Sequence, residues 1–418
     1  MESEPKYARI TMMICLVIAG ESIFSLPFHI PRYFRPSFLE ALSLSNAELG
    51  DIFAAYGLTA MLAYVPGGFL ADRFSPRKLM SISLWATAAG GIPLMMFPGV
   101  LVLQLLFAYW GLTTILMFWA AMIRATRDLG STSHQGRAFG ILDGGRGLVA
   151  AAAATLTVWI LGQGLESSTE IAMMSARQEA LRQVIAFYMG LTILAGGLCW
   201  FWIPEAPPAE AKKQENHILL ALKSPSLWLQ AGIVICAYCG YKGIDNYALY
   251  AKDVLQMDEV GAARFGAWTA YLRPIGAISA GFLADRLRAR HMIAGLFAAL
   301  LLVYVVLGTG SLLLPAAILI LNLIVSYLAV FALRGIYFAL LQEAQIDKRA
   351  TGAAVGVISV IGYTPDIFFG SISGRILDGA PGAEGHGNYF LFLSLLAALG
   401  LVCTLFLARR ISRTLPAS

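Results

Sequence analysis

Twelve long apolar stretches constrain the fold of this chain more than any other feature of its sequence. A helix needs about 20 mostly apolar residues to cross the hydrocarbon core of a bilayer. Only 13% of the 418 residues are charged and 58% are hydrophobic, whereas a water-soluble domain has about 25% charged residues. The composition excludes a soluble enzyme, a disordered chain and a nucleic-acid-binding protein, and it predicts an all-α integral membrane protein. The predicted spans cover residues 9–31, 47–72, 78–98, 100–124, 136–164, 182–203, 226–251, 262–286, 291–310, 314–341, 351–377 and 388–408.

The Lys and Arg residues are distributed unevenly over the segments that join these stretches. With the N-terminus inside, 19 of the 30 fall on inner segments, 6 on outer segments (Arg32 and Arg35 among them) and 5 within spans. Because cytoplasmic loops of membrane proteins carry the excess of positive charge, this count predicts that both termini are cytoplasmic (N-in/C-in). The stretches lack the alternation of a transmembrane barrel. Glycines four residues apart, such as Gly370 and Gly374, predict close packing of helices.

An internal repeat divides the chain into two halves. The hexapeptide GFLADR at 68–73 recurs unchanged at 281–286, each time at the inner end of the second span of its half. A weaker echo pairs GRAFG at 136–140 with TGAAVG at 351–356. A polar stretch rich in Pro, Ala, Glu and Lys, typical of a linker, lies between the halves. We therefore predict an N-terminal six-helix bundle over 1–203, a cytoplasmic linker over 204–225 and a pseudo-symmetric six-helix bundle over 226–418.

These motifs resemble those of a transporter family. GGFLADRFSPRK at 67–78 is similar to the signature between spans two and three of the major facilitator superfamily, with Ser75 and Pro76 in place of the usual glycine. GRAFGILDGGRG at 136–147 and TGAAVGVISVIGY at 351–363 resemble the bacterial organic-anion branch of that superfamily, which includes sulfosugar-pathway transporters. The resemblance covers nearly the whole chain. It implies twelve helices in two bundles that rock about a central site and expose it alternately to each side.

Two arginines inside predicted spans are the main candidates for binding substrate. Arg146 and Arg273 come from opposite halves and lie near mid-depth of the bilayer. A charge there costs roughly 2.5–3.5 kcal/mol on insertion scales, so such residues face the bundle interior and are functional by default. Their guanidinium groups suit a carboxylate, sulfonate or phosphate. The alternative is that a neighbouring carboxylate neutralises each of them, for example Asp143, which lies on the same helical face as Arg146.

Carboxylates in predicted spans are the candidates for proton coupling. Glu21 lies near the midplane in the first span, and Asp366 and Asp143 are further candidates. A desolvated carboxyl group can bind and release protons within a physiological range of pH. The alternative is that Glu21 forms a fixed salt bridge with a basic residue of another span, namely Arg273, Arg146 or Lys242.

By the same resemblance, the repeated GFLADR motif belongs to a cytoplasmic gate. An Asp near the positive end of a helix is favourable by roughly 0.3–1 kcal/mol, a suitable scale for a latch that must reopen. The alternative is that the basic residues only orient the chain, which leaves the repeated Asp unexplained. The predicted gate residues are Asp72, Arg73, Arg77, Arg137, Asp285 and Arg286.

Aromatic residues near mid-span are candidates for lining the same cavity, where a hydroxyl group or ring edge would contact the substrate. Packing or anchoring at the membrane interface is the alternative for each of them. Lys242 is expected near the outer end of the seventh span, paired with Asp245. Besides the two arginines, the predicted substrate-binding residues are Tyr56, Trp119, Tyr241, Lys242, Tyr271 and Tyr337.

These features predict a secondary active transporter of a small organic anion, with proton-coupled import as the leading hypothesis. A proton-coupled exporter is the alternative. By resemblance, such exporters carry a Gly-Pro pair in a glycine-rich fifth span, where this chain has Arg146. A membrane enzyme is disfavoured because clustered His and carboxylate ligands are missing from the sequence. An ATP-driven pump is disfavoured because a phosphate-binding glycine-rich loop is missing as well.

The expected partners follow from the same features. The five cysteines all fall in apolar segments and the five histidines show no ligand spacing, so we expect no metal, no cofactor and no disulfide. We expect an anionic substrate, protons and the lipid bilayer as partners, and no nucleic acid. The protein is expected to be a monomer in the bacterial inner (cytoplasmic) membrane.

Overall fold

The structure is a computed structural model, and it contains helices and no strands in the residues that it describes, which are 6–129, 135–165, 173–205, 222–284, 287–311, 313–340, 351–380 and 382–414. The elements of the N-terminal half, here called the N-group, are α1 (Lys6–Ser22), η1 (Ser25–His29), α2 (Ile30–Tyr33), α3 (Arg35–Ala41), α4 (Asn46–Arg73), α5 (Pro76–Ala89), α6 (Gly91–Leu94), α7 (Val100–Gly111), η2 (Leu112–Trp119), α8 (Ala120–Leu129), α9 (Gln135–Leu165) and α10 (Met173–Trp202). Those of the C-terminal half, the C-group, are α12 (Pro225–Gly243), η4 (Ile244–Asn246), α13 (Tyr247–Asp253), α14 (Glu259–Ala270), α15 (Leu272–Ala284), α16 (Ala289–Gly310), α17 (Ala316–Ile336), η5 (Tyr337–Ala339), α19 (Thr351–Gly362), α20 (Pro365–Gly379) and α21 (Ala383–Thr414).

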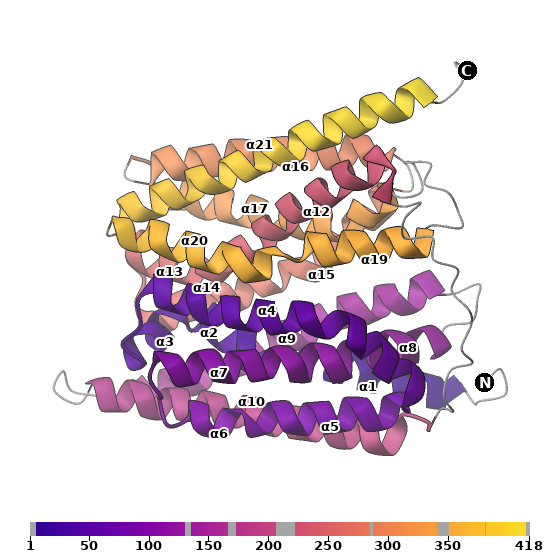
Figure 1. Cartoon of the computed structure of the whole chain (residues 1–418). Coiled ribbons are helices and arrows are strands. Elements are labelled where there is room, and N and C mark those ends of the chain that lie inside the picture. Colours follow the sequence, from indigo (N-terminus) through magenta and orange to yellow (C-terminus); the bar gives the residue numbers. More distant parts are fainter. Residues whose placement is uncertain are drawn as a thin grey trace.

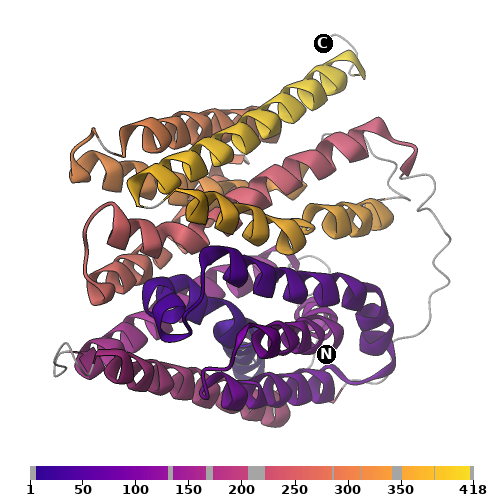
Figure 2. The same ribbon diagram turned by 60° about the vertical axis from the view of Figure 1, so that its left-hand side comes forward.

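The two groups form two layers. In Figure 1 the N-group fills the lower part of the molecule and the C-group the upper part, and the turned view of Figure 2 keeps them apart. The long helices run from one side of the molecule to the other, and the start of α1 lies on the same side as the end of α21 (Figure 1). We call this side the terminal face and the opposite side the far face. Two ends on one side agree with an even number of membrane crossings.

Local sequence determines where several of these helices begin. Ser45 and Glu48 form a capping box at the start of α4, in which the Ser45 hydroxyl accepts from the Glu48 N–H and the Glu48 carboxylate accepts from the Ser45 N–H. Pro76, Pro225 and Pro365 occupy the first turns of α5, α12 and α20. A proline is tolerated there because the first N–H groups of a helix have no partner within the helix.

Long apolar helices supply the membrane-crossing segments. In the described part of the chain, nine helices are long and apolar enough to cross a membrane, or ten if the bent pair Tyr7–Ser22 and Ser25–Tyr33 counts as one. The predicted third and eighth spans are each divided, into α5 and α6 around Gly90 and into α14 and α15 around Tyr271. The prediction of an all-helical membrane protein is confirmed, and the number twelve stays a prediction. Most of the predicted linker at 204–225 lies outside the described residues.

The first span continues further than its sequence indicates. After α1 the chain passes through the π-helix η1 and into α2, with a bend of 43°. Pro27 lies in η1, and a proline removes a backbone donor and bends the helix that contains it. The segment beyond the bend folds inward, so that Arg32 and Arg35 are only 8% and 3% exposed. Both arginines are therefore buried, and Arg32 belongs to the bent span rather than to the segment after it; their position on the outer side of the membrane stays a prediction.

Glycines allow the N-group and the C-group to approach each other closely along α4 and α20. A Cβ atom added to Gly374 would lie 2.2 Å from the carbonyl oxygen of Asn46, and one added to Gly50 would lie equally close to the backbone of Gly370. The close packing that the spacing of Gly370 and Gly374 predicts is confirmed for this pair of helices.

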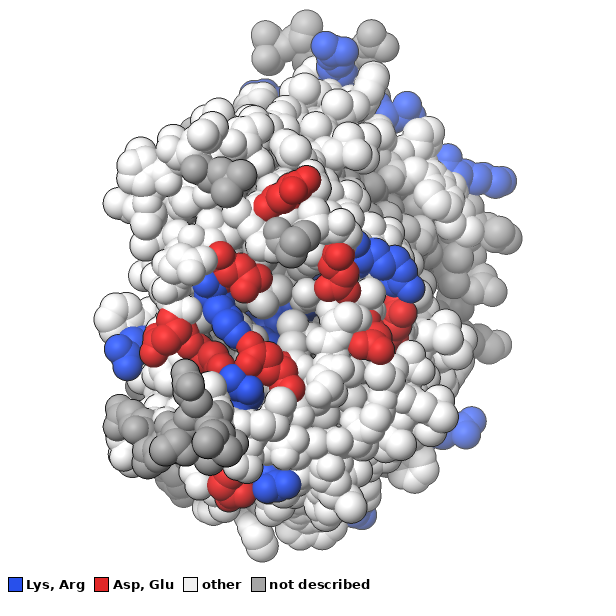
Figure 3. Space-filling model, turned by 90° about the vertical axis from the view of Figure 1, so that its left-hand side faces the viewer, with Lys and Arg blue, Asp and Glu red and all other residues white. Residues whose placement is uncertain are grey.

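Charged contacts join the two groups at the far face. Arg177 of α10 lies 2.5 Å from Glu259 of α14, and Asp51 of α4 lies 2.9 Å from Arg375 of α20. Lys252 of α13 pairs with Glu40 of α3. Figure 3 looks onto this face and shows Lys and Arg side chains beside Asp and Glu near its centre. The two groups are therefore tied together at the far face.

Candidate functional site

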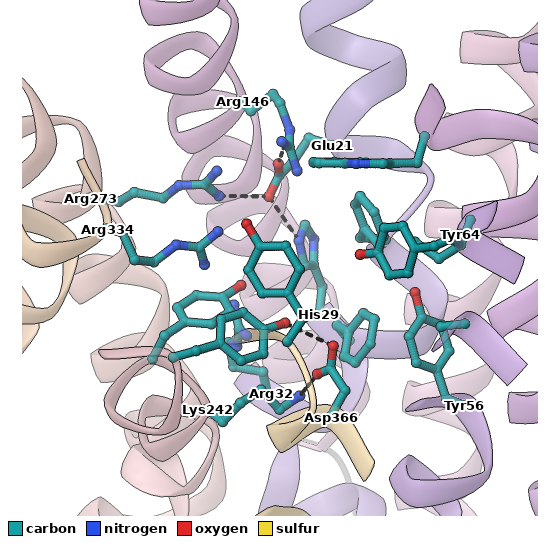
Figure 4. Close-up of a pocket in the computed structure, with 18 residues that line it drawn as sticks. Glu21, His29, Arg32, Tyr56, Tyr64, Arg146, Lys242, Arg273, Arg334 and Asp366 are labelled. Carbon is teal, nitrogen blue, oxygen red and sulfur yellow. Dashed lines mark hydrogen bonds and ion pairs between the residues drawn. The ribbon is translucent and has the colours of Figure 1, made fainter. Parts of the chain in front are cut away.

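A pocket of about 800 Å³, including its open mouth, lies between the N-group and the C-group. Its walls combine basic, acidic and aromatic side chains, as the close-up in Figure 4 shows. The N-group supplies residues from α1 through α2, α4, η2 and α9, and the C-group from α12, α15, α17 and the junction of α19 and α20. The lining residues are Glu21, Phe24, Phe28, His29, Arg32, Tyr56, Ala60, Tyr64, Ile115, Trp119, Arg146, Tyr238, Tyr241, Lys242, Arg273, Arg334, Tyr363 and Asp366.

Glu21 is the centre of one charged cluster in this pocket. Its Oε2 accepts a hydrogen bond from Arg146 Nε at 3.0 Å, and its Oε1 accepts one from Arg273 Nη1 at 3.1 Å. His29 Nε2 lies 3.1 Å from the same Oε1. Arg273 Nη2 also donates to Asp143 Oδ1 at 3.0 Å. Arg273 is the only one of these five residues, here called the Glu21 cluster, that belongs to the C-group, so its side chain ties the two groups together beside the pocket.

Lys242 is the centre of a second cluster. Its Nζ lies 3.3 Å from Asp245 Oδ2 and 3.4 Å from Asp366 Oδ1. Arg32 Nε donates to Asp245 Oδ1 at 2.5 Å, and the Tyr238 hydroxyl donates to Asp366 Oδ2 at 2.9 Å. We call these five residues the Lys242 cluster. Since Arg32 belongs to the N-group and the other four to the C-group, the contact between Arg32 and Asp245 is a further ion pair between the two groups.

Arg334 of α17 belongs to neither cluster. Its guanidinium carbon lies 3.8 Å from the centroid of the Tyr241 ring, and that of Arg32 lies 4.9 Å from the same centroid. Within the described residues Arg334 has no carboxylate at ion-pair distance, and its Nη1 is buried without a hydrogen-bond partner. Figure 4 shows Arg334 beside Arg273, with both side chains directed into the pocket.

The pocket and the carboxylates that contact its basic residues carry an excess of one positive charge, when His29 is counted as neutral. The basic residues are Arg32, Arg146, Lys242, Arg273 and Arg334. The carboxylates are Glu21 and Asp366 in the lining, and Asp143 and Asp245 directly behind it. A buried charge without a partner is unfavourable. The site is therefore electrostatically suited to a small anion, and its aromatic walls offer ring faces and hydroxyl groups to the rest of that molecule.

Most of the predicted substrate-binding residues line this pocket. They are Tyr56, Trp119, Arg146, Tyr241, Lys242 and Arg273. Tyr271 does not, because it lies at the break between α14 and α15, is 39% exposed and has its hydroxyl 3.2 Å from that of Thr155. Tyr337 is buried behind the lining, with its hydroxyl 3.3 Å from that of Tyr363. Arg146 and Arg273 already contact carboxylates. Neutralisation by a neighbouring carboxylate, the alternative to substrate binding in the sequence analysis, therefore describes their contacts in this structure.

The predicted proton-coupling residues all belong to the two clusters, although Asp143 contacts Arg273 from outside the pocket lining. The pairing of Lys242 with Asp245 is confirmed. Both residues are buried beside the pocket, and their expected position near the outer end of the seventh span stays a prediction.

The predicted gate is described only in part. Asp72 and Arg73 are exposed at the end of α4, and Arg77 lies over the ring of Trp200 at 5.0 Å. The side chain of Arg137, and Asp285 and Arg286 as a whole, lie outside the described residues.

The structure also brings residues to the pocket that sequence reasoning missed. His29, Arg32, Tyr64, Tyr238 and Arg334 all line it. Arg334 lies within a predicted span, and a charged residue in a span is by itself evidence for a position in the bundle interior. Arg32 had no such signal, because it follows the predicted end of the first span.

Comparison with known proteins identifies the family. The family profile described as the Major Facilitator Superfamily matches residues 10–370. The chain is 27% identical to the inner membrane protein YqcE of Escherichia coli, over 95% of this chain and 93% of that protein. It is 28% identical to the inner membrane protein YihN of the same organism, over 95% of each chain.

Solved structures share the same fold. A bacterial homologue of the human lysosomal transporter Spinster, in an inward-facing and unoccupied conformation, has a TM-score of 0.73 at 15% identity, covering 99% of this chain and 100% of that one. The nucleoside transporter NupG has a TM-score of 0.70 at 11% identity, covering 96% and 98%. The protein is an integral membrane protein of a transporter family rather than an enzyme. The family match covers most of the sequence, and the chain therefore belongs to the major facilitator superfamily.

Proposed function

We propose that the protein moves a small organic anion across the membrane by alternating access. The observation that carries this proposal is the excess of one positive charge in a pocket that lies between the two groups. An anion that contacts both groups has different contacts in states open to opposite faces, which couples its binding to the movement of the groups. The resemblance of residues 136–147 and 351–363 to the organic-anion branch of the superfamily supports the same class of substrate.

Glu21 is our candidate for coupling transport to protons. It holds Arg146 of the N-group and Arg273 of the C-group at the same time. Protonation removes the negative charge of Glu21 and weakens both contacts, which releases the C-group to move. His29 lies against Glu21, and its Nδ1 is buried without a partner in the described part of the chain, so it offers a path for the proton. Asp366 beside Lys242 is the second candidate.

A transporter that binds a proton and an anion in one pocket accumulates the anion when the proton gradient points inward. We propose import for this reason, as a symporter in the inner membrane. The alternative that Glu21 forms a permanent salt bridge predicts transport that is insensitive to the proton gradient. An exporter of the same superfamily predicts movement against the direction of proton entry.

We propose that the terminal face is cytoplasmic, because the excess of Lys and Arg is expected on the side of the chain ends. The contacts at the far face then close the periplasmic side of the pocket. In this state Asp72 is exposed, as we expect for a cytoplasmic gate that is open. The two six-helix bundles, 1–203 and 226–418, rock as units of a monomer about the linker at 204–225.

Transport by the purified protein in proteoliposomes tests the proposal. Radiolabelled sugar acids, sulfonated sugars and dicarboxylates are added outside, with an inward proton gradient, an outward gradient or none. We expect accumulation of at least one anion with the inward gradient and loss of its uptake in Arg273→Ala, with normal insertion of that variant. Gradient-driven movement in the opposite sense identifies an exporter. Failure of every anion class to move or to stabilise the purified protein contradicts the proposal.

A further inference from the structure

We infer that Arg334 binds the acidic group of the substrate and that the substrate carries a single negative charge. This inference rests on the proposed anion transport and narrows the class of substrate. It differs from the sequence-based prediction, which assigns the anion to Arg146 and Arg273.

The other basic residues of the pocket already contact carboxylates. Arg146 and Arg273 belong to the Glu21 cluster, and Arg32 and Lys242 belong to the Lys242 cluster. An anion that bound one of these four side chains would share it with a carboxylate or exchange places with that carboxylate, and the charge of the side chain is already compensated. Binding at these positions would therefore bring no net gain of charge compensation.

Arg334 can accept an anion without such an exchange. Its guanidinium group stacks on the ring of Tyr241 at 3.8 Å, which fixes the plane of the group and leaves its N–H edge for other partners. The Nη1 atom is buried and has no hydrogen-bond partner within the described residues. The side chain points into the pocket in Figure 4. A carboxylate or sulfonate is the chemistry that satisfies this edge, because both accept two parallel hydrogen bonds from a guanidinium group.

The charge of the substrate follows from the charges around it. With five basic residues and four carboxylates, one negative charge makes the site neutral. The count covers the basic residues of the lining and the carboxylates that form ion pairs with them. Arg35 is not counted, since it neither lines this pocket nor forms an ion pair with any of these carboxylates, and it donates to Asn46. A second negative charge on the substrate would be buried without a partner. We therefore expect monoanions to bind more tightly than dianions of the same carbon skeleton.

The remainder of the pocket suits a molecule with hydroxyl groups. Tyr64 and Tyr241 line it, and neither hydroxyl forms a hydrogen bond to a described residue. Phenol hydroxyls both donate and accept, so they match the hydroxyl groups of a polyol acid without adding charge.

Ligand-dependent thermal stability of the purified full-length protein tests the inference. One probe series is sorbitol, gluconate and glucarate, which share six carbons and carry zero, one and two negative charges. A second series is benzamide, benzoate and phthalate, measured likewise at pH 8 and constant ionic strength. We expect the singly charged member of at least one series to stabilise the wild type most. Arg334→Gln should weaken its apparent affinity roughly 10- to 100-fold, the range of a lost charge-assisted interaction.

Two further variants make the result specific. Arg334→Lys retains the charge without the paired N–H edge, so it should preserve the preference for the monoanion with weaker binding. Arg264→Gln is the matched control: Arg264 is exposed on α14 and lies outside this pocket, so it should behave as the wild type. If Arg334→Gln does not fold, brief treatment of the wild type with phenylglyoxal replaces it. We then expect Arg334 to be modified before the other pocket arginines, and gluconate or benzoate to protect it.

The outcomes separate this inference from the proposed function. Tighter binding of a dianion, unchanged monoanion affinity in Arg334→Gln, or slower modification of Arg334 than of Arg273 overturns the inference and leaves anion transport standing. A wild type that none of the four anions stabilises, together with no anion uptake in proteoliposomes, overturns both.

Discussion

Replacement of Glu21 by Gln removes the charge of a side chain with three polar contacts in the pocket and hardly changes its shape. The carboxylate accepts from Arg146 and Arg273 and contacts His29. Gln has nearly the same volume but no charge, and its amide nitrogen is a donor that faces other donors. The substitution therefore leaves the guanidinium groups of Arg146 and Arg273, which come from opposite groups of helices, without the anion between them.

The magnitude follows from the distances. The arginine nitrogens lie 3.0 and 3.1 Å from the Glu21 oxygens, which corresponds to about 5 kcal/mol of attraction for each pair at an effective dielectric constant of ~20. Burial of the charges costs several kcal/mol per ion and offsets much of this attraction. Removal of one partner from a buried pair destabilises a protein by about 3–5 kcal/mol. We expect a destabilisation of this size for Glu21→Gln.

Two measurements check the prediction. Thermal unfolding of the purified variant should occur at a clearly lower temperature than that of the wild type. In proteoliposomes, Glu21→Gln should exchange labelled for unlabelled substrate but should not accumulate it on a proton gradient, because the group that binds the proton is gone. Glu205→Gln is the matched control: Glu205 pairs with Lys78 at an exposed position, where such pairs contribute little, so both measurements should stay at wild-type values.

Two results would refute the reasoning. Uphill accumulation by a folded Glu21→Gln variant would mean that protons are coupled at another group or not at all. Unchanged thermal stability would mean that Arg146 and Arg273 find other partners at no cost, and the Glu21 cluster would then not hold the two groups together.

Other predictions concern the two faces of the molecule. Gly374→Ala places a methyl group 2.2 Å from the carbonyl oxygen of Asn46, so the far face should open more often, measured as faster labelling of single cysteines introduced there. Asp51→Asn removes the partner of Arg375 and should likewise favour opening, with an effect that shrinks at high salt because exposed pairs are screened; equal effects at low and high salt would contradict it. Asp72→Ala should reduce the transport rate several-fold while binding affinity in thermal-shift titrations stays the same, and an unchanged rate would leave the proposed gate without support.

Much of the candidate site can be predicted from charged residues that lie within apolar stretches of the sequence. Glu21, Arg146, Arg273 and Asp366 interrupt apolar stretches, and a charge at membrane depth is expensive enough to imply an interior position. All four indeed line one pocket. Tyr271 fails the same reasoning, because an aromatic residue is equally acceptable facing lipid, so its type does not determine its direction.

The ion-pair partners of these charged residues cannot be predicted from the sequence. Arg334 is as visible in the sequence as Arg146, yet its significance depends on whether a carboxylate lies within ion-pair distance of it, and the sequence does not show which helices pack against its side chain. Arg32 was beyond prediction for another reason, since the bend around Pro27 carries it inward after the apolar stretch has ended.

The sequence by itself determined that this protein is a helical membrane protein, because apolar runs of this length with so few charges can satisfy their backbone groups in lipid only as helices. It also determined the two repeated halves on which the family resemblance rests. Only the tertiary structure decided which charges compensate one another. Ion pairing acts over a few ångströms between side chains of different helices, and the packing of those helices, rather than any local pattern, leaves Arg334 as the basic residue without a carboxylate in the described part of the pocket.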